Sequence, residues 1–172
     1  MEKRNVLFVM SSLRNGGAER SLVNLLQLLD YDRYNVDLLL FQNEGMFLKQ
    51  VPKAVNIISN CNKLYTLYDN NKAEALKHPY LSAIHMIGTF ISRKKTNSVA
   101  KSRQYRWEHF YKKIVPELTK EYDVAIAYMQ REQTYFLVDK VKAAKKIAWV
   151  HNEYSQLGHF KEMDLEYFEK VD

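Results

Sequence analysis

A short apolar run, followed by a polar loop with two adjacent glycines and then an amphipathic segment, constrains this chain more than any other feature. The run Val6–Met10 is continuous and bounded by polar residues, as in a strand buried on both faces of a parallel sheet. Within 18–29 the apolar residues recur at helical spacing, which predicts a helix with one core-facing stripe. Apolar runs at 36–41 and 55–58 predict two further strands. Strand, helix and strand in this order predict a right-handed crossover onto a parallel sheet.

The same alternation returns after an irregular middle. Pro79 suits the first turn of a helix, and Pro116 ends another because the residue before a proline is pushed out of helical geometry. We therefore predict an α/β fold, with a Rossmann-like, doubly wound, mostly parallel sheet and helices on both faces. The further predicted elements are helices at 79–92, 98–115, 134–141 and 160–170 and strands at 124–128 and 147–150.

The composition is that of a globular chain with a real core. Of the 172 residues, 47% are hydrophobic and 27% are charged, close to the averages for soluble domains. The lone cysteine, Cys61, excludes an intrachain disulfide and a cysteine-rich zinc framework, which favours a reducing compartment. The start of the chain does not read as a signal peptide, and no apolar stretch approaches the roughly 20 residues of a spanning helix. We expect a cytoplasmic protein, free or peripheral on the inner face of the cell membrane.

One domain accounts for residues 1–172, since domains average about 150 residues. A helix on a parallel sheet normally delivers the chain to a further strand, and none follows the predicted helix at 160–170. We therefore expect a truncated chain; a natural helical C-terminus is the alternative.

Four polar loops are predicted to meet at one edge of the sheet. In open parallel sheets, ligands bind at the carboxyl ends of the strands. The strand assignments send Ser11–Gly17, Gln42–Gly45, Met129–Glu132 and His151–Ser155 to that edge. Much of the unusual polar chemistry of the sequence lies in these loops.

Gly16 and Gly17 stand in the first loop, where the predicted helix starts. Free N–H groups and the positive end of a helix favour a phosphate there, and glycine lets the backbone come close to it. The loop lacks both the Gly-Lys-Ser/Thr ending of a P-loop and the Gly-x-Gly-x-x-Gly dinucleotide fingerprint. A plain turn is the alternative reason for the glycine pair.

His151 follows the last predicted strand and would lie beside the glycine loop. There its imidazole could exchange hydrogen bonds with a sugar hydroxyl or a phosphate, or it could simply cap or pack. The sequence contains neither a metal-ligand spacing of His and Cys nor a Gly-x-Ser-x-Gly elbow. Metal-dependent hydrolysis and serine nucleophile chemistry are therefore excluded.

A basic block interrupts an otherwise neutral chain. From Arg93 to Lys120 there are nine Lys or Arg and two Glu, so this segment is more positive than the whole chain, whose net charge is +6. Within Arg93–Lys113 a helix would present aromatic side chains on one face with cations alongside, which suits an anionic membrane surface. The same face could bind RNA, or pack its aromatics on the sheet. Its apolar residues are Tyr105, Trp107, Phe110, Tyr111 and Ile114.

Several segments together resemble a known family. Residues 6–25, 34–40, 122–128 and 146–152 resemble, in order, the amino-terminal domain of GT-B retaining glycosyltransferases of glycosyltransferase family 4, the type that builds bacterial surface polysaccharides. The segment Gly16–Arg20 is the most specific part, and the middle of the chain is the least. The resemblance implies an enzyme of two Rossmann-like domains that face a cleft.

The resemblance also assigns expected roles to residues. Gly16 and Gly17 would lie against the donor diphosphate, His151 would contact the transferred sugar at the catalytic centre, and Glu19 and Arg20 would lie on the acceptor side. It implies a nucleotide-sugar donor as substrate, no metal and no cofactor. The second domain, which grips the nucleotide-sugar in that family, is absent from these residues, so the chain alone is expected to be inactive.

The expected partners are the nucleotide-sugar, a glycan or lipid-linked acceptor, and an anionic membrane surface met through Arg93–Lys113, with no nucleic acid. Two other functions stay open. One is a stand-alone phosphate- or nucleotide-binding module, and the other is a membrane-surface adaptor built on the basic segment.

Overall fold

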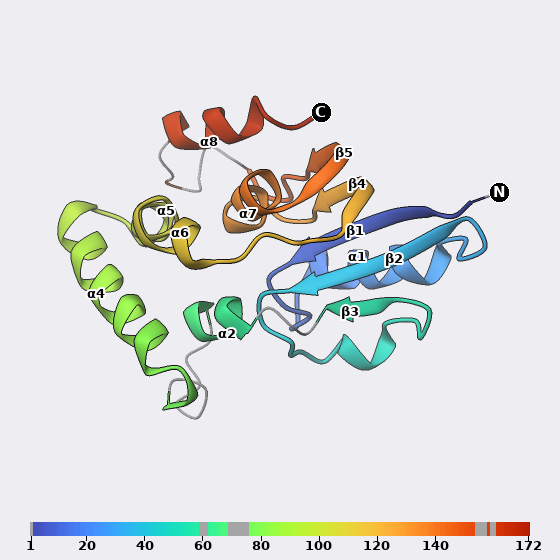
Figure 1. The fold of residues 1–172 in the computed structure, drawn as a ribbon, viewed down its shortest axis with the longest axis horizontal. Helices are drawn as coiled ribbons and strands as arrows, with labels where there is room; N and C mark the ends of the chain where they lie inside the picture. Colours follow the sequence, from blue (N-terminus) through green and yellow to red (C-terminus); the bar gives the residue numbers. More distant parts are fainter. Residues whose placement is uncertain (1, 59–61, 69–75, 154–157, 159–160) are drawn as a thin grey trace.

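A five-stranded parallel sheet is the frame of the protein (Figure 1). The computed structural model describes residues 2–58, 62–68, 76–153, 158 and 161–172. Within them the strand order is β3-β2-β1-β4-β5, and every neighbouring pair is parallel. This confirms the predicted α/β, Rossmann-like, doubly wound fold. The strands are β1 (Arg4–Met10), β2 (Tyr34–Leu40), β3 (Asn56–Ile58), β4 (Glu121–Ala127) and β5 (Lys142–Ala148).

One face of the sheet is covered by helix α1 (Gly17–Leu28) and the short 3₁₀ turn η1 (Leu48–Gln50). Leu22 and Leu26 of α1 are fully buried and belong to the same apolar cluster as Phe8 of the central strand. The cluster is mostly aliphatic, and it forms because the stripe predicted from the sequence faces the sheet.

The opposite face carries the helices from the rest of the chain (Figure 1). Trp107 and Phe136 are fully buried there, among several buried tyrosines. Gly88 brings α4 close to Phe110: a Cβ on this glycine would already touch the Phe110 ring at 3.4 Å. The helices are α2 (Asn62–Tyr68), α4 (Pro79–Lys95), α5 (Val99–Arg106), the π-helical turn η2 (Trp107–Tyr111), α6 (Lys112–Ile114), α7 (Glu132–Lys140) and α8 (Lys161–Phe168).

The structure differs most from the predicted elements at two places, and the bounds of the others shift by up to three residues. The helix predicted at 98–115 is interrupted by the π turn η2, although it ends before Pro116 as expected. The strand predicted at 147–150 is wrong in its bounds, because β5 begins at Lys142 and ends at Ala148. As the outer strand of the sheet, β5 is half solvated and exposes Lys142 and Lys145, so it lacks the apolar run of a central strand.

Some sequence predictions fall wholly or partly outside the residues that the structure describes. Cys61 and residue 160, where the last helix was predicted to start, both lie outside the described residues. Within the described residues, no helix combines the length and the apolar character that crossing a membrane requires.

Candidate functional site

The carboxyl ends of four strands lie along one edge of the sheet, because all of the strand pairs are parallel. The segments that follow β1, β2, β4 and β5 therefore begin at this edge, as the sequence predicted. Residues 154 and 155 of the last predicted loop lie outside the described residues.

The first half of the β1–α1 loop is braced by the loop after β2. Leu13 N–H donates to the Glu44 carbonyl at 2.9 Å, and Phe47 N–H donates to the Leu13 carbonyl at 3.1 Å. Gly45 makes this approach sterically feasible, with φ of +124°, and a Cβ there would collide with the Leu13 carbonyl. From the sequence, Gly45 was predicted only as the end of a loop, although a glycine within a loop can indicate such a backbone.

The second half of the loop is open. Gly16 is the N-cap of α1 in an extended conformation, with no side-chain cap, and the carboxylate of Glu19 folds back against it. Apart from Gly17, its chain neighbours and the backbone of α1, no heavy atom of the described residues lies within 4 Å of the position that a Cβ on Gly17 would occupy. The start of α1 therefore presents backbone N–H groups beside open space. Arg20 is exposed, and its guanidinium lies 5.4 Å from the centre of the Phe47 ring.

His151 lies at the same edge as the glycine loop, and Tyr128 stands between them. The Tyr128 ring centre is 5.0 Å from that of His151, and the Tyr128 hydroxyl is 3.0 Å from the Ser21 hydroxyl in the second turn of α1. The His151 backbone N–H donates to the Gln130 side-chain oxygen at 3.3 Å. His151 itself is exposed, whereas Tyr128 and Gln130 are buried. The sequence reasoning missed both supports, since nothing but their place after β4 marks them.

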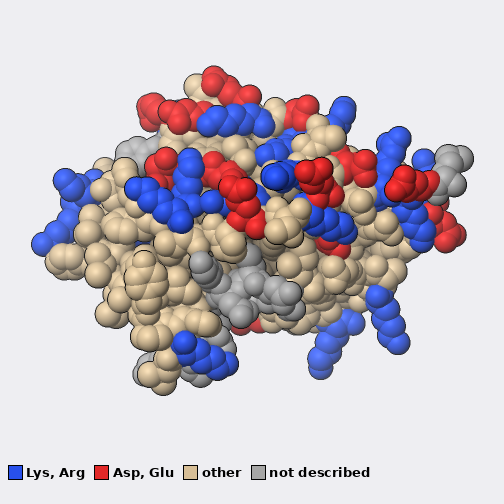
Figure 2. Space-filling view, in the orientation of Figure 1, with Lys and Arg blue, Asp and Glu red and all other residues tan. Residues whose placement is uncertain are grey.

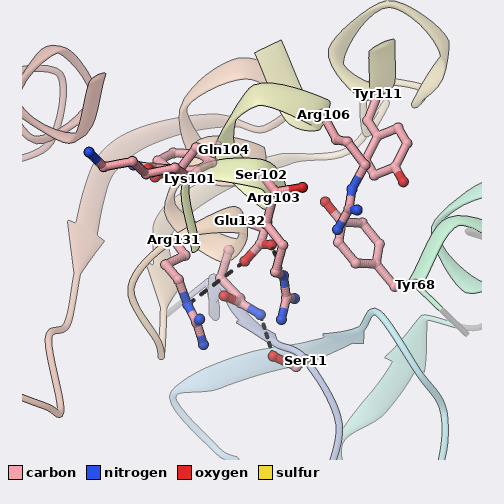
Figure 3. A network of polar contacts seen from close by, with 12 residues as sticks. Ser11, Tyr68, Lys101, Ser102, Arg103, Gln104, Arg106, Tyr111, Arg131 and Glu132 are labelled. Atoms are coloured by element: carbon pink, nitrogen blue, oxygen red, sulfur yellow. Dashed lines mark hydrogen bonds and ion pairs between the residues drawn. The ribbon is translucent and has the colours of Figure 1, made fainter. Parts of the chain in front are cut away.

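The buried carboxylate of Glu132 lies at the centre of a polar network at the same edge, on the side of helices α5 and α7 (Figure 3). Glu132 begins α7 and is 1% exposed. Its carboxylate forms a close ion pair with Arg103 of α5 and lies 4.0 Å from the Arg131 Nε. Next to it, the Gln133 amide donates to the Ser11 hydroxyl after β1. These contacts tie α5 and α7 to the carboxyl end of β1, and they fix the direction of Arg103.

Arg131 has a backbone conformation that favours glycine, with φ of 78°. A strained backbone of this kind persists only where surrounding contacts hold it in place, and it is enriched at functional sites. Here it lies at the start of α7, next to Glu132 and one residue after the support of His151. No feature of the sequence predicted this conformation.

The aromatic residues of the basic segment divide into two groups. Trp107 and Tyr111 are fully buried in the core, and they cannot enter a bilayer in this structure. Tyr105 and Phe110 are half-buried. Packing on the sheet thus occupies part of the predicted aromatic face, while membrane contact through Arg93–Lys113 stays a prediction.

The edge offers hydrogen-bond donors and cations to a ligand. Among the described residues, no group of three His, Cys, Asp or Glu side chains is arranged to hold a metal ion.

A scan against protein-family models, a search of curated proteins and a search of solved structures each found no match for this chain. A functional proposal therefore depends on the geometry of this edge and on the resemblance of the four sequence segments.

Proposed function

We propose that these residues are the acceptor-side, amino-terminal domain of a retaining GT-B glycosyltransferase. The reaction would move a sugar from a nucleotide-sugar to a glycan or a lipid-linked acceptor. The observation that carries this proposal is that the open glycine start of α1 and the exposed His151 share one edge of a parallel sheet, with Tyr128 between them.

The glycine loop suits the leaving diphosphate of the donor. Negative charge builds on that group as the bond to the sugar breaks, and backbone N–H groups at a helix start stabilise it without reorganisation. The open space beside Gly17 leaves room for it. Because the Glu19 carboxylate lies against Gly16, we expect this side chain to turn toward the acceptor side when a diphosphate binds.

His151 suits a contact with the transferred sugar. Its imidazole is exposed at the edge, its backbone is held by Gln130, and its ring lies against Tyr128. In this proposal it exchanges hydrogen bonds with a sugar hydroxyl and fixes the ring for transfer. Arg20, exposed near Phe47, would lie on the acceptor side together with Glu19.

Catalysis in this proposal needs a second domain across the cleft to hold the nucleotide. The described residues form one five-stranded parallel sheet, and we expect this chain alone to bind a nucleotide-sugar weakly and to transfer no sugar. Full-rate transfer by the purified 172-residue chain would contradict this expectation.

The test uses the full-length protein that contains these residues, with release of nucleoside diphosphate from a panel of nucleotide-sugars as the readout. We expect His151→Ala to lower kcat by about 100-fold or more, as loss of a transition-state contact does. The neighbouring exposed residue provides the matched control, Asn152→Ala, which should keep kcat within about threefold. Unchanged turnover in His151→Ala would remove the catalytic role, and no turnover of any nucleotide-sugar by the wild type would refute the proposed function.

A further inference from the structure

A cavity opens at the same edge, between the carboxyl ends of β1 and β2 and the helices α4 and α5. Its volume is about 420 Å³. Among the described residues that line it are Arg14, Arg93, Arg103 and Arg106, and no Asp or Glu. A cavity with this lining favours an anion.

Two of these arginines lack an acidic partner. Arg14 pairs with Glu44, and Arg103 pairs with the buried Glu132. Within the described part of the chain, neither Arg93 nor Arg106 forms an ion pair. The cavity therefore carries about two positive charges that the described residues of its walls do not neutralise.

Buried polar atoms at the cavity wall also lack partners. The Arg106 Nε and the Tyr68 hydroxyl are both shielded from solvent, and neither has a hydrogen-bond partner among the described residues. Burial raises the pKa of Tyr68 well above its usual value, so its hydroxyl keeps its proton and can donate. Buried donors are nearly always satisfied in proteins, so these two point to a missing acceptor.

The remaining contacts hold the donors in place. Arg106 donates through one terminal nitrogen to the Thr89 hydroxyl of α4 at 3.0 Å, and His85 Nδ1 is 2.9 Å from the Tyr111 hydroxyl. Figure 3 shows the side chains of Arg103 and Arg106 extending from α5, with Glu132 beside Arg103. Guanidinium groups held in this way match the oxygens of a phosphate, which they bind in pairs of hydrogen bonds.

We propose that this cavity binds the phosphate or diphosphate group of the sugar acceptor. The inference rests on the proposed function, in which the donor diphosphate binds at Gly16 and Gly17. The arginine-lined cavity is then available to a phosphate of the acceptor. The phosphate could belong to a soluble phosphorylated glycan or to a lipid-linked one. Figure 2 shows mostly uncharged surface over α4, with basic side chains near both ends of the helix. Of the residues of α4, Ile87 is 55% and Phe90 is 61% exposed.

The first experiment titrates the 172-residue chain with inorganic diphosphate in a calorimeter. We expect Arg93→Gln combined with Arg106→Gln to raise the Kd by about 100-fold, since loss of each charge-assisted contact is worth roughly tenfold. The matched control, Lys94→Gln combined with Lys95→Gln, removes the same charge outside the cavity and should change the Kd by less than about threefold. Equal weakening in both variants, or no binding by the wild type at millimolar diphosphate, would overturn the proposal.

A spectroscopic readout guards against misfolding of the double variant. His85 lines the cavity, so a bound anion should stabilise its charged form. We expect diphosphate to raise the pKa of His85 in an NMR titration of the wild type, and to raise it less in the single variant Arg93→Gln. An unchanged His85 pKa at saturating diphosphate would place the anion elsewhere and contradict the proposal.

Vesicles distinguish the two sources of phosphate. Phosphatidylcholine vesicles containing phosphatidic acid should capture the chain, and diphosphate should displace it, if the cavity takes a lipid-borne phosphate. Diphosphate binding without capture assigns a soluble phosphorylated acceptor. Capture that neither diphosphate nor the double variant weakens counts against the cavity. If the full-length protein binds diphosphate but transfers no sugar, the anion site is supported and the proposed function is refuted. If it transfers sugar but does not bind diphosphate, only the anion site is refuted.

Discussion

The two halves of the carboxyl edge are built differently. On the arginine half, Glu132 is buried, its ion pair fixes Arg103, and Arg106 is held by Thr89. On the glycine half, Gly17 borders open space and His151 is exposed, with Tyr128 and Gln130 beneath it. Arg103 and Arg106 of the arginine half are therefore held before a ligand arrives, whereas the glycine half leaves one side open.

This difference separates two ways of using a sheet edge. Side chains locked by buried partners lose little freedom on binding, so the arginine half suits recognition of one fixed group. An open half suits a ligand that is shared with a second surface, as the proposed function requires of the donor. Substitutions that destabilise one half and spare the other test this comparison.

The largest effect is expected from the buried ion pair. Glu132→Gln leaves Arg103 without its acidic partner, so the free energy of unfolding should fall by about 3–5 kcal/mol. The exposed pair gives the control: Glu44→Gln removes the partner of Arg14 and should lower it by less than about 1 kcal/mol. Urea unfolding of both variants measures the two losses of unfolding free energy. Similar losses would show that burial of Glu132 does not make its ion pair more important than the exposed one.

Two glycines give the next contrast. Gly45→Ala forces a Cβ into the Leu13 carbonyl at a φ of +124°, and we expect it to destabilise the fold by about 2 kcal/mol or more. Gly17→Ala meets open space at the start of a helix and should change the free energy of unfolding by less than about 1 kcal/mol, toward higher stability. Thermal unfolding compares them; a strongly destabilised Gly17→Ala would show that the open half is braced after all.

The smallest effect concerns pH and the wall of the arginine cavity. Burial, and then the charge of Arg106, lower the pKa of His85 below its usual value. His85 therefore stays neutral in the folded protein at pH values where the unfolded chain binds a proton, so folding loses stability as the pH falls below about 6.5. We expect His85→Gln to flatten the fall in unfolding free energy below about pH 6.5. If the variant and the wild type show the same pH dependence, His85 is not the group that causes this loss of stability.

The fold was largely predictable because apolar runs report directly on buried strands. Val6–Met10 became part of β1, and the stripe of α1 faces the sheet as its spacing predicted. Once the strands were assigned as parallel, their carboxyl ends had to lie at one edge, which is why Gly16, Gly17 and His151 could be placed there in advance. The start of β5 was missed because an edge strand needs no apolar run.

The supports of the site could not be predicted, because they depend on contacts between segments far apart in the chain. Glu132 and Arg103 are separated by 29 residues, and only the packing of α5 against α7 pairs them. The charge of the basic segment was evident from the sequence, but which of its cations meet at one cavity was not. Arg93 comes from α4, and Arg103 and Arg106 come from α5, so only the packing of these two helices brings them together.

The lysines exposed on β5 have a consequence for self-association. An outer strand offers unpaired backbone groups to which a second copy could add its own strand. Lys142 and Lys145 would bring like charges together in such a pairing, and their ammonium groups would have to lose water. The same lysines that interrupt the apolar pattern of β5 thus also discourage edge-to-edge aggregation of the protein.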